Sequence, residues 1–490
     1  MIPDAFNFPL PDRQWDLVLP IAMVVLTGIV ALILELAQPK RNNNLLVITS
    51  MLGLALSGVM LAVQLGAPPL TAFAETLVRD RLSVGVQLIL VMGTSLIVLF
   101  SEPYLREKRI PFGEFYPLIL WSTSGAMLMV STTNLLVIFV GLEILSISLY
   151  VMAGLSRDQE SSNESALKYF LLGAFASGFL LYGIAMFYGA SGTLDLNGFQ
   201  SVWLKGAASM RPLLAFGLAM ILVGLSFKAS FFPFQQWTPD VYQGAPTNVT
   251  AFMATGSKVA AFATLYRVLE AAFPLKDIWL PALGAVAVLT ILYGNLVALL
   301  QKDVKRILGY SSIAQAGYVL VAILAHGAMP REVGPDTLLY FLFGYTLTTI
   351  GAFSIVGLGA RDGREYNSLE DLNGLVKRSP LAAWSLAIFM ASLLGILPSP
   401  GLFGKAMIFL DAIRAGLTPL AIVLAIGSII SGYYYLAIAY HAVAPDREVV
   451  QDRLATMRPA VTAACGICLV GVIGAALFFQ PVLVILAGRL

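Results

Sequence analysis

The chain has little charge. Only 12% of its 490 residues are Asp, Glu, Lys or Arg, whereas a soluble domain usually carries about 25%. Hydrophobic residues make up 58%, which is typical of an integral membrane protein. The net charge of +2 gives no basis for binding nucleic acid. The scarcity of charge therefore predicts a polytopic protein whose surroundings are the lipid bilayer.

Cysteine and histidine are also scarce. The two cysteines are too few for a disulfide framework or a four-thiolate zinc site. They form a CxxC, but in an apolar segment without a basic neighbour that would favour a thiolate. Neither His326 nor His441 has an apparent ligand partner, and there is no phosphate-cradling glycine loop or haem-attachment motif. We therefore expect no metal and no cofactor on this chain.

Apolar runs near the bilayer-spanning length of about 20 residues recur from end to end. They predict an all-α protein of about fourteen membrane helices with short loops and no soluble domain. The start lacks the basic region of a cleaved signal peptide, so the first run is expected to remain as a spanning helix. The runs lie near residues 17–37, 44–65, 82–101, 113–131, 133–154, 166–190, 212–232, 247–270, 279–300, 305–325, 335–358, 380–410, 417–442 and 459–487.

Basic residues gather in alternate loops. The loops that follow odd-numbered helices are the richer ones, with Lys40, Arg106, Lys302, Arg378 and Arg458 among their residues. Because cytoplasmic loops carry an excess of Lys and Arg, these loops are expected to face the cytoplasm. Both termini are then expected on the opposite side of the membrane.

Four ionisable residues interrupt the apolar runs, namely Glu143, Lys228, Lys258 and Lys405. A lysine at the bilayer centre costs about 2.5–3.5 kcal/mol on insertion scales, so such residues usually serve ion or proton movement. Burial disfavours the ammonium form and a nearby carboxylate favours it. Glu143 and Lys228 therefore form a candidate switch, Lys258 a relay and Lys405 an exit. The alternative is that these charges pair permanently and only hold helices together.

Two predicted helices contain prolines near these lysines. Pro233 follows Lys228 in the seventh helix, and Pro398 and Pro400 precede Lys405 in the twelfth. Proline removes a backbone donor, and in a membrane the freed carbonyls need partners from protein or water. An interrupted helix in each half of a polytopic chain indicates a transport site between repeats, although the sequence shows no obvious self-similarity.

Other polar residues are weaker candidates. Lys168 follows Glu164 by four residues, which suits either a surface helical pair or a supporting role. Ser311, Ser312 and Gln315 form a polar stripe on the tenth helix. The stripe suits either a hydrated path or hydrogen bonds between helices.

Several segments together resemble the N-subunit family of the NADH–quinone oxidoreductase of respiratory complex I, one branch of the antiporter-like membrane subunits. They extend from the fifth to the twelfth predicted helix. WTPDVYQGAP distinguishes this family from the related L and M subunits, and Lys405 argues against the M subunit, which has a glutamate there. The segments are GLEILSISLYVMAGL, ESALKYFLLGAFASG, SFKASFFPFQQWTPDVYQGAPTNVTAFMATGSKVAAF, LGYSSIAQAGY and GILPSPGLFGK.

The resemblance implies fourteen helices with two inverted five-helix repeats, in which helices 7 and 12 are broken. Residues 1–112 would hold helices 1–3, 113–275 the first repeat, 276–445 the second repeat and 446–490 helix 14. It also implies M- and K-type membrane subunits as neighbours, with FMN, iron–sulfur clusters and quinone bound by other subunits.

The family pattern assigns proton-relay roles to Glu143, Lys228, Lys258 and Lys405. The sequence departs from the pattern at Gln235 and Gln315, where many relatives have histidine. Glutamine orders water but carries no proton at neutral pH, so ordered water is expected to bridge Lys258 and Lys405. The second proline of the usual GIPP segment is displaced in GILPSPG, which puts the shape of that break in doubt.

The function expected from these observations is proton translocation coupled to quinone reduction in other subunits of an NADH–quinone oxidoreductase. One alternative is a subunit of a multisubunit cation/proton antiporter or of a membrane-bound hydrogenase, which share the fold. A second alternative is a membrane scaffold that moves no ions. Lysines that stay charged and fixed at every pH would favour the scaffold.

Overall fold

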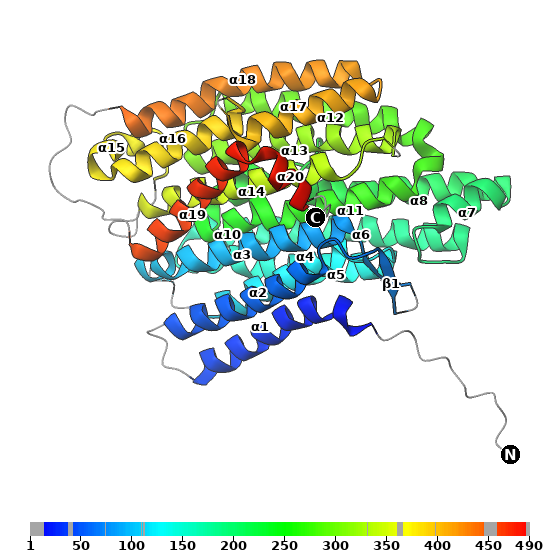
Figure 1. Cartoon of the computed structure of the whole chain (residues 1–490), viewed down its shortest axis with the longest axis horizontal. Coiled ribbons are helices and arrows are strands. Elements are labelled where there is room, and N and C mark those ends of the chain that lie inside the picture. Colours follow the sequence, from blue (N-terminus) through cyan, green and yellow to red (C-terminus); the bar gives the residue numbers. More distant parts are fainter. Residues whose placement is uncertain are drawn as a thin grey trace.

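The computed structural model describes residues 14–37, 43–73, 75–108, 110, 113–330, 332–359, 366–396, 398–444 and 458–486. This part of the chain is an elongated bundle of helices (Figure 1), which confirms the predicted all-α membrane fold. Ten predicted runs form single unbroken helices: α1 (Leu19–Ala37), α2 (Asn44–Gln64), α3 (Arg81–Glu107), α4 (Phe115–Val130), α5 (Leu135–Ala153), α6 (Glu160–Ser191), α12 (Lys276–Ala298), α13 (Val304–Ala328), α14 (Asp336–Val356) and α18 (Thr418–Val443).

The other four runs are divided, and two of the divisions are the predicted breaks. Helix 7 consists of α8 (Arg211–Ala229) and α9 (Trp237–Gly244), and helix 12 of α16 (Pro380–Leu394) and α17 (Pro400–Arg414). Helix 14 is α19 (Pro459–Leu477) with a short α20 (Phe479–Leu486).

The eighth run contains a feature that the sequence did not indicate. A π-helical turn, η4 (Met253–Ser257), separates α10 (Thr247–Phe252) from α11 (Lys258–Ala271). Such turns are rare and occur frequently at functional sites. Here the turn ends directly before Lys258.

Small elements complete the loops. They are α7 (Gly198–Lys205), α15 (Leu375–Arg378) and an antiparallel hairpin of β1 (Leu70–Ala72) and β2 (Leu77–Arg79). Among the described residues, 11 helices are long and apolar enough to cross a membrane. The count is below fourteen because α4 is short and because the eighth and twelfth runs are divided into pieces.

The two ends of the bundle are distinct. At one end, the loop before α13 pairs with the loop that follows α14, through Asp303 and Ser368. We call this end, which carries Lys302 and Arg378, the basic end. At the opposite end Asn134 pairs with Asp195. In Figure 1, α15 marks the basic end and α7 the opposite end.

The loops that carry Lys302 and Arg378 thus share one end of the bundle, and the side of the membrane that this end faces stays a prediction. Lys40 lies outside the described residues, as do the predicted domain boundaries at 112 and 445–446. The division into domains therefore stays a prediction.

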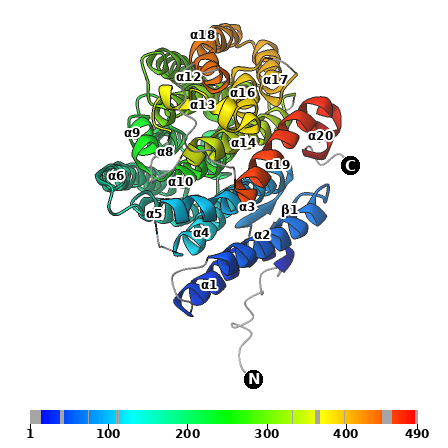
Figure 2. The same cartoon turned by 90° about the vertical axis from the view of Figure 1, so that its left-hand side faces the viewer.

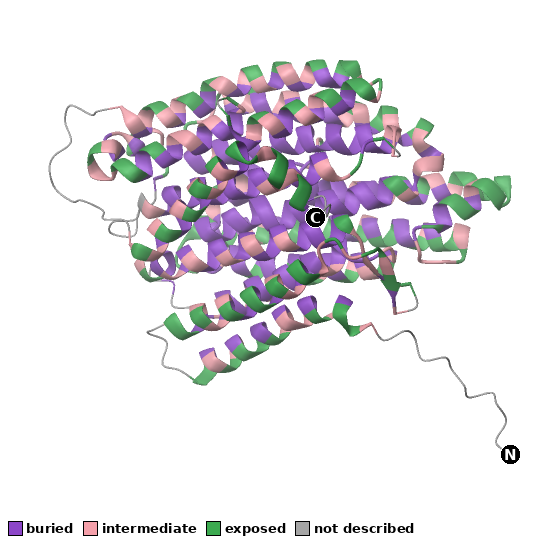
Figure 3. Ribbon diagram, in the orientation of Figure 1, coloured by how far each residue is buried: buried purple, intermediate pink, exposed green. Residues whose placement is uncertain are grey.

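Among the described helices long enough to span a membrane, α13 and α14 are the most buried. In the most apolar part of α13 every residue is buried, and in that of α14 94% are buried, against 33% in α2. Figure 2, which looks along the bundle, shows α1 and α2 at its edge, and Figure 3 shows the buried residues concentrated in the middle. The polar stripe of helix ten, on α13, therefore lies in the interior of the protein.

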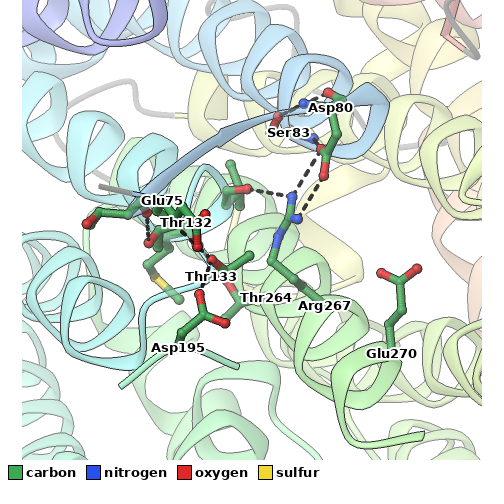
Figure 4. Close-up of polar contacts among 12 residues, drawn as sticks. Glu75, Asp80, Ser83, Thr132, Thr133, Asp195, Thr264, Arg267 and Glu270 are labelled. Atoms are coloured by element: carbon green, nitrogen blue, oxygen red, sulfur yellow. Dashed lines mark hydrogen bonds and ion pairs between the residues drawn. The ribbon is translucent and has the colours of Figure 1, made fainter. Parts of the chain in front are cut away.

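A buried ion pair fastens α11 to the start of α3. Arg267 Nη1 lies 2.8 Å from Asp80 Oδ2, and Nη2 lies 3.1 Å from Oδ1. Asp80 also caps α3 by accepting from the backbone N–H of Ser83 at 2.8 Å. Figure 4 shows this cluster, with Glu270 on the same helix as Arg267. Arg267 was not among the predicted candidates, although it lies in the same apolar run as Lys258.

Replacing Asp80 by Asn is expected to destabilise the protein by about 3 kcal/mol, because it leaves the Arg267 guanidinium buried and unpaired. Asp16→Asn is the matched control, because Asp16 forms an ion pair with Arg79 at the same end but its side chain is 52% exposed. That change should cost less than about 1 kcal/mol. Thermal unfolding of both variants in detergent tests this, and equal losses would contradict it.

The same ion pair predicts a dependence of stability on pH. Burial by itself would raise the pKa of Asp80, but the charge and hydrogen bonds of Arg267 outweigh burial and hold that pKa below its ordinary value. Because the folded pKa is the lower one, the pair contributes fully above the unfolded pKa of about 3.9. Its contribution is lost as the pH falls through the folded pKa. Asp80→Asn should remove this part of the acid sensitivity.

Candidate functional site

The break in helix 7 places Lys228 at a helix end inside the protein. α8 stops because Ser230 adopts a left-handed conformation, with φ of 64°. The carbonyl of Phe227 accepts the backbone N–H of Ser230 at 3.1 Å, and it also accepts a hydrogen bond from Trp237 Nε1 at 2.9 Å. Thr238 donates to Ser230 across the break at 2.7 Å. Side chains of the WTPDVYQGAP segment thus form hydrogen bonds across the break.

Lys228 is buried, with 2% exposure, and its partners are neutral. The ammonium group donates to Ser146 Oγ at 2.8 Å and to Tyr169 Oη at 3.0 Å. Glu143 is half-buried on α5 and accepts from Ser177 Oγ at 2.5 Å. In the described part of the chain these two predicted switch residues form no direct ion pair. Ser146, which binds Lys228, lies one turn from Glu143 on α5.

Lys258 has no exposed surface. It donates to Ser312 on α13, at 2.6 Å to the hydroxyl and 3.2 Å to the carbonyl oxygen. Its Nζ also lies 5.7 Å from the centre of the Tyr242 ring, close enough for a cation–π attraction. Ser312 receives a further hydrogen bond from Tyr345 at 3.2 Å.

The break in helix 12 supplies the partners of Lys405. α16 ends at Leu394 because Gly395 adopts a positive φ of 85°. A helix end leaves carbonyls without intrahelical partners. Lys405, 5% exposed, donates to the carbonyl oxygens of Leu393 and Leu394, each at 2.9 Å. Ser399 caps α17 by accepting from the backbone N–H of Leu402. The displaced proline of GILPSPG is thus compatible with a formed break.

The polar stripe of α13 links the two halves of the site. Gln315 Nε2 donates to the Leu393 carbonyl at 2.9 Å, the same oxygen that binds Lys405, and to Tyr435 Oη at 3.0 Å. The Ser311 hydroxyl lies 2.5 Å from Tyr435 Oη. Ser312, the next residue, binds Lys258. Protein groups therefore cover much of the interval that was expected to need ordered water.

The remaining candidates lie apart from this chain of contacts. Lys168 is partly exposed and pairs with Glu164 Oε1 at 2.5 Å, as the spacing predicted, and also with Asp240 Oδ2 at 3.0 Å. Asp240 binds Arg306 at 2.7 Å as well, so Lys168 belongs to a charged cluster toward the basic end. Gln235 is buried, and its Oε1 has no hydrogen-bond partner among the described residues.

Three hydroxyl groups of the site, those of Ser146, Tyr169 and Tyr435, were not predicted. Ser146 and Tyr169 bind Lys228, and Tyr435 joins Ser311 to Gln315. A serine carries little signal in an apolar helix, because its hydroxyl commonly bonds to a carbonyl of its own helix, and a tyrosine commonly packs as an aromatic residue. Their proximity to the lysines depends on how distant helices pack.

The arrangement suits proton exchange better than permanent pairing. Within the described part of the chain, Lys228, Lys258 and Lys405 donate only to hydroxyls and carbonyls and form no ion pair. A neutral amine can remain in such surroundings, whereas a fixed carboxylate would retain the proton. No group of three or more His, Cys, Asp or Glu residues suited to a metal is found among the described residues.

Residues 132–431 match the family described as NADH:quinone oxidoreductase/Mrp antiporter, TM. The chain is 40% identical to NADH-quinone oxidoreductase subunit N 1 of Herpetosiphon aurantiacus, over 91% of each chain. It also resembles a chain of respiratory complex I from Thermus thermophilus, with a TM-score of 0.81 and 36% identity, covering 96% of this chain and 99% of that one.

The fold extends to more distant complexes. A chain of the archaeal membrane-bound sulfane sulfur reductase superposes with a TM-score of 0.85 at 24% identity, covering 96% of each chain, which shows a shared fold alone. The high identity over nearly the full length sets the subunit N proteins apart from this wider group. The chain belongs to the subunit N family of NADH-quinone oxidoreductase.

Proposed function

We propose that this chain moves protons across the membrane through Glu143, Lys228, Lys258 and Lys405, driven by quinone reduction in other subunits of the complex. The observation that carries the proposal is the state of the three lysines, each buried and each held only by neutral partners. A buried ammonium without a counter-ion is costly, so each lysine is poised to lose its proton when its surroundings change.

The first step assigned to the relay is at Glu143 and Lys228. Ser177 holds the Glu143 carboxylate, and Ser146 and Tyr169 hold Lys228. A rearrangement that lets the carboxylate replace Ser146 would stabilise the ammonium form. A return to the present arrangement would release the proton. The charge on Lys228 then affects Lys258. A protonated Lys228 lowers the affinity of Lys258 for its proton, and a neutral Lys228 raises it.

The second step joins Lys258 to Lys405. Ser311, Gln315 and Tyr435 connect the Ser312 segment to the carbonyl of Leu393. Hydroxyl groups both donate and accept, so they can pass a proton in concert with water, whereas Gln315 holds the geometry. Gln235, with its unpartnered oxygen, is suited to bind a water near the break in helix 7. Lys168 offsets the negative charges of Glu164 and Asp240 near the basic end.

The proposed setting is the inner membrane of a bacterium. The basic end would face the cytoplasm and both termini the other side, in line with the distribution of Lys and Arg. The relatives are named as subunits of NADH-quinone oxidoreductase, so the proposed partners are its other membrane subunits, of M and K type. FMN, iron–sulfur clusters and quinone would be bound by other subunits.

Purification from the native membrane in a mild detergent tests the assignment. We expect the chain in a large assembly that reduces quinone with NADH and is blocked by complex I inhibitors. If the chain instead copurifies only with membrane subunits that exchange cations for protons, the antiporter alternative replaces the redox part of the proposal.

A further inference from the structure

The last turns of α11 and α13 form a second polar site, separate from the lysine chain. His326 on α13 is buried, with 3% exposure, and its Nε2 lies 3.8 Å from Oε1 of Glu270 on α11. The rings of His326 and Tyr266 stack with their centroids 3.9 Å apart. Because Glu270 has a 51% exposed side chain, it connects the buried imidazole to the surroundings.

The hydrogen bonds of His326 decide which nitrogen carries hydrogen. Nδ1 lies 2.5 Å from the carbonyl oxygen of Val333, and a carbonyl oxygen only accepts, so Nδ1 must donate. The Tyr266 hydroxyl, 2.9 Å from Nδ1, can share that hydrogen. Nε2 of the neutral ring is then a bare acceptor with no hydrogen-bond partner among the described residues. It faces an ionised carboxylate, which is also only an acceptor. One proton bound between them satisfies both groups.

Glu270 also lines an open cavity of about 800 Å³ at the opposite end of the bundle. The cavity is large enough to hold water, since a single water molecule needs only roughly 10–15 Å³ of such space. Its wall includes Arg267, Glu332, Asn197 and Thr133. The Glu270 carboxylate therefore contacts both the cavity and the buried imidazole.

Among the described residues around the site, carboxylates outnumber cations. On the cavity wall, Glu270 is accompanied by Arg267, the one cation among the described lining residues. Arg267 is already held by Asp80 in two hydrogen bonds, and Glu332 adds another carboxylate to the cavity wall. An excess of carboxylates stabilises a proton bound nearby.

The site lies on the same two helices as the central lysine. Lys258 begins α11 and binds Ser312 on α13. Between these groups and the Tyr266, Glu270 and His326 site, α11 and α13 carry three polar side chains, Thr264, Gln315 and Tyr318. Thr264 is bound to the Met129 carbonyl, Gln315 to the Leu393 carbonyl and Tyr435, and Tyr318 to Asn295. In the described part of the chain no side-chain hydrogen bonds bridge this apolar interval, so it separates the two sites until water enters.

We propose that Glu270 and His326 form a proton-release site for the first repeat, a second exit reached from Lys258 along α11 and α13, beside the route through Lys405. The inference rests on the proposed function. A proton arriving at Nε2 converts His326 to the imidazolium and pairs it with Glu270. Transfer to Glu270 and then to water in the cavity returns the neutral ring, with Nδ1 still bonded to Val333.

The test uses the intact complex in vesicles whose lumen faces the opposite end. Protons delivered per NADH oxidised are measured in wild type, Glu270→Gln, His326→Gln and the double variant, at several lumen pH values between about 5 and 8, where histidine changes charge. Glu332→Gln is the matched control, an acid on the same cavity wall. Lys258→Met reports on the proposed function itself.

We expect Glu270→Gln and His326→Gln to lower the proton yield equally, and the double variant to lose no more than either single one. Wild-type yield should fall as the lumen is acidified, and Glu270→Gln should abolish that dependence, which a merely structural role would not do. Glu332→Gln should match wild type. If His326→Gln fails to assemble, the pH profile of Glu270→Gln decides alone, because that side chain is half exposed.

The release site is ruled out if Glu270→Gln gives the wild-type proton yield at every lumen pH while Lys258→Met gives a reduced yield. The proposed function would then still hold. Unchanged yield in Lys258→Met as well overturns both.

Discussion

Lys258→Met should abolish proton transfer through this subunit while NADH–quinone turnover continues. The methionine side chain fills much of the same space without a titratable group, and the Ser312 hydroxyl and carbonyl lose their donor. A positioned acid–base group typically contributes about 10²–10⁴-fold to the rate of proton transfer. The contribution of this subunit to the proton yield per NADH should therefore fall by about 100-fold or more.

Two further variants separate the chemistry from the charge. Lys205→Met makes the same change at an exposed residue at the end of α7 and should pump as wild type. Lys258→Arg keeps a positive charge that cannot be lost in a protein. It should fail like Lys258→Met if the residue exchanges a proton, and should retain pumping if only its charge matters. Retained pumping in Lys258→Met would rule out the relay role.

Gly401→Ala should disrupt the break in helix 12 and lower the stability of the assembled protein. A Cβ at this position would stand 1.7 Å from the carbonyl oxygen of Ser392 and 2.8 Å from its carbonyl carbon. Both atoms belong to the backbone, so α16 and α17 must separate. Overpacking of this kind typically costs about 1–3 kcal/mol and occasionally more. Lys405 would then lose its carbonyl partners on Leu393 and Leu394.

The matched control is Gly466→Ala in α19, where an added Cβ meets no atom within 4 Å. Alanine is the better helix former by about 1 kcal/mol, so this change should leave the melting temperature unchanged or raise it. Lys405→Met should lower the proton yield, because it removes one of the two exits from Lys258, without a comparable loss of stability. The measurements are thermal unfolding of the purified complex and its proton yield. A wild-type melting temperature in Gly401→Ala would refute the tight contact between α16 and α17.

The sequence by itself determined the membrane fold and the candidate residues. Apolar runs of spanning length specify helices because backbone N–H and C=O groups in lipid must be hydrogen-bonded within the protein. Prolines near Lys228 and Lys405 indicated the two breaks. The four ionisable residues stood out because charge is costly at these depths. These signals are local, so they can be obtained from the order of residues alone.

Only the tertiary structure decided what each lysine contacts. Ser146 lies 82 residues from Lys228, and Ser312 lies 54 residues from Lys258. The carbonyls that bind Lys405 are available only because α16 ends at Leu394. The π turn before Lys258 and the Glu270–His326 site likewise left no signal in the sequence. Hydroxyls, carbonyls and single carboxylates are common, and only the packing of distant helices gives them partners.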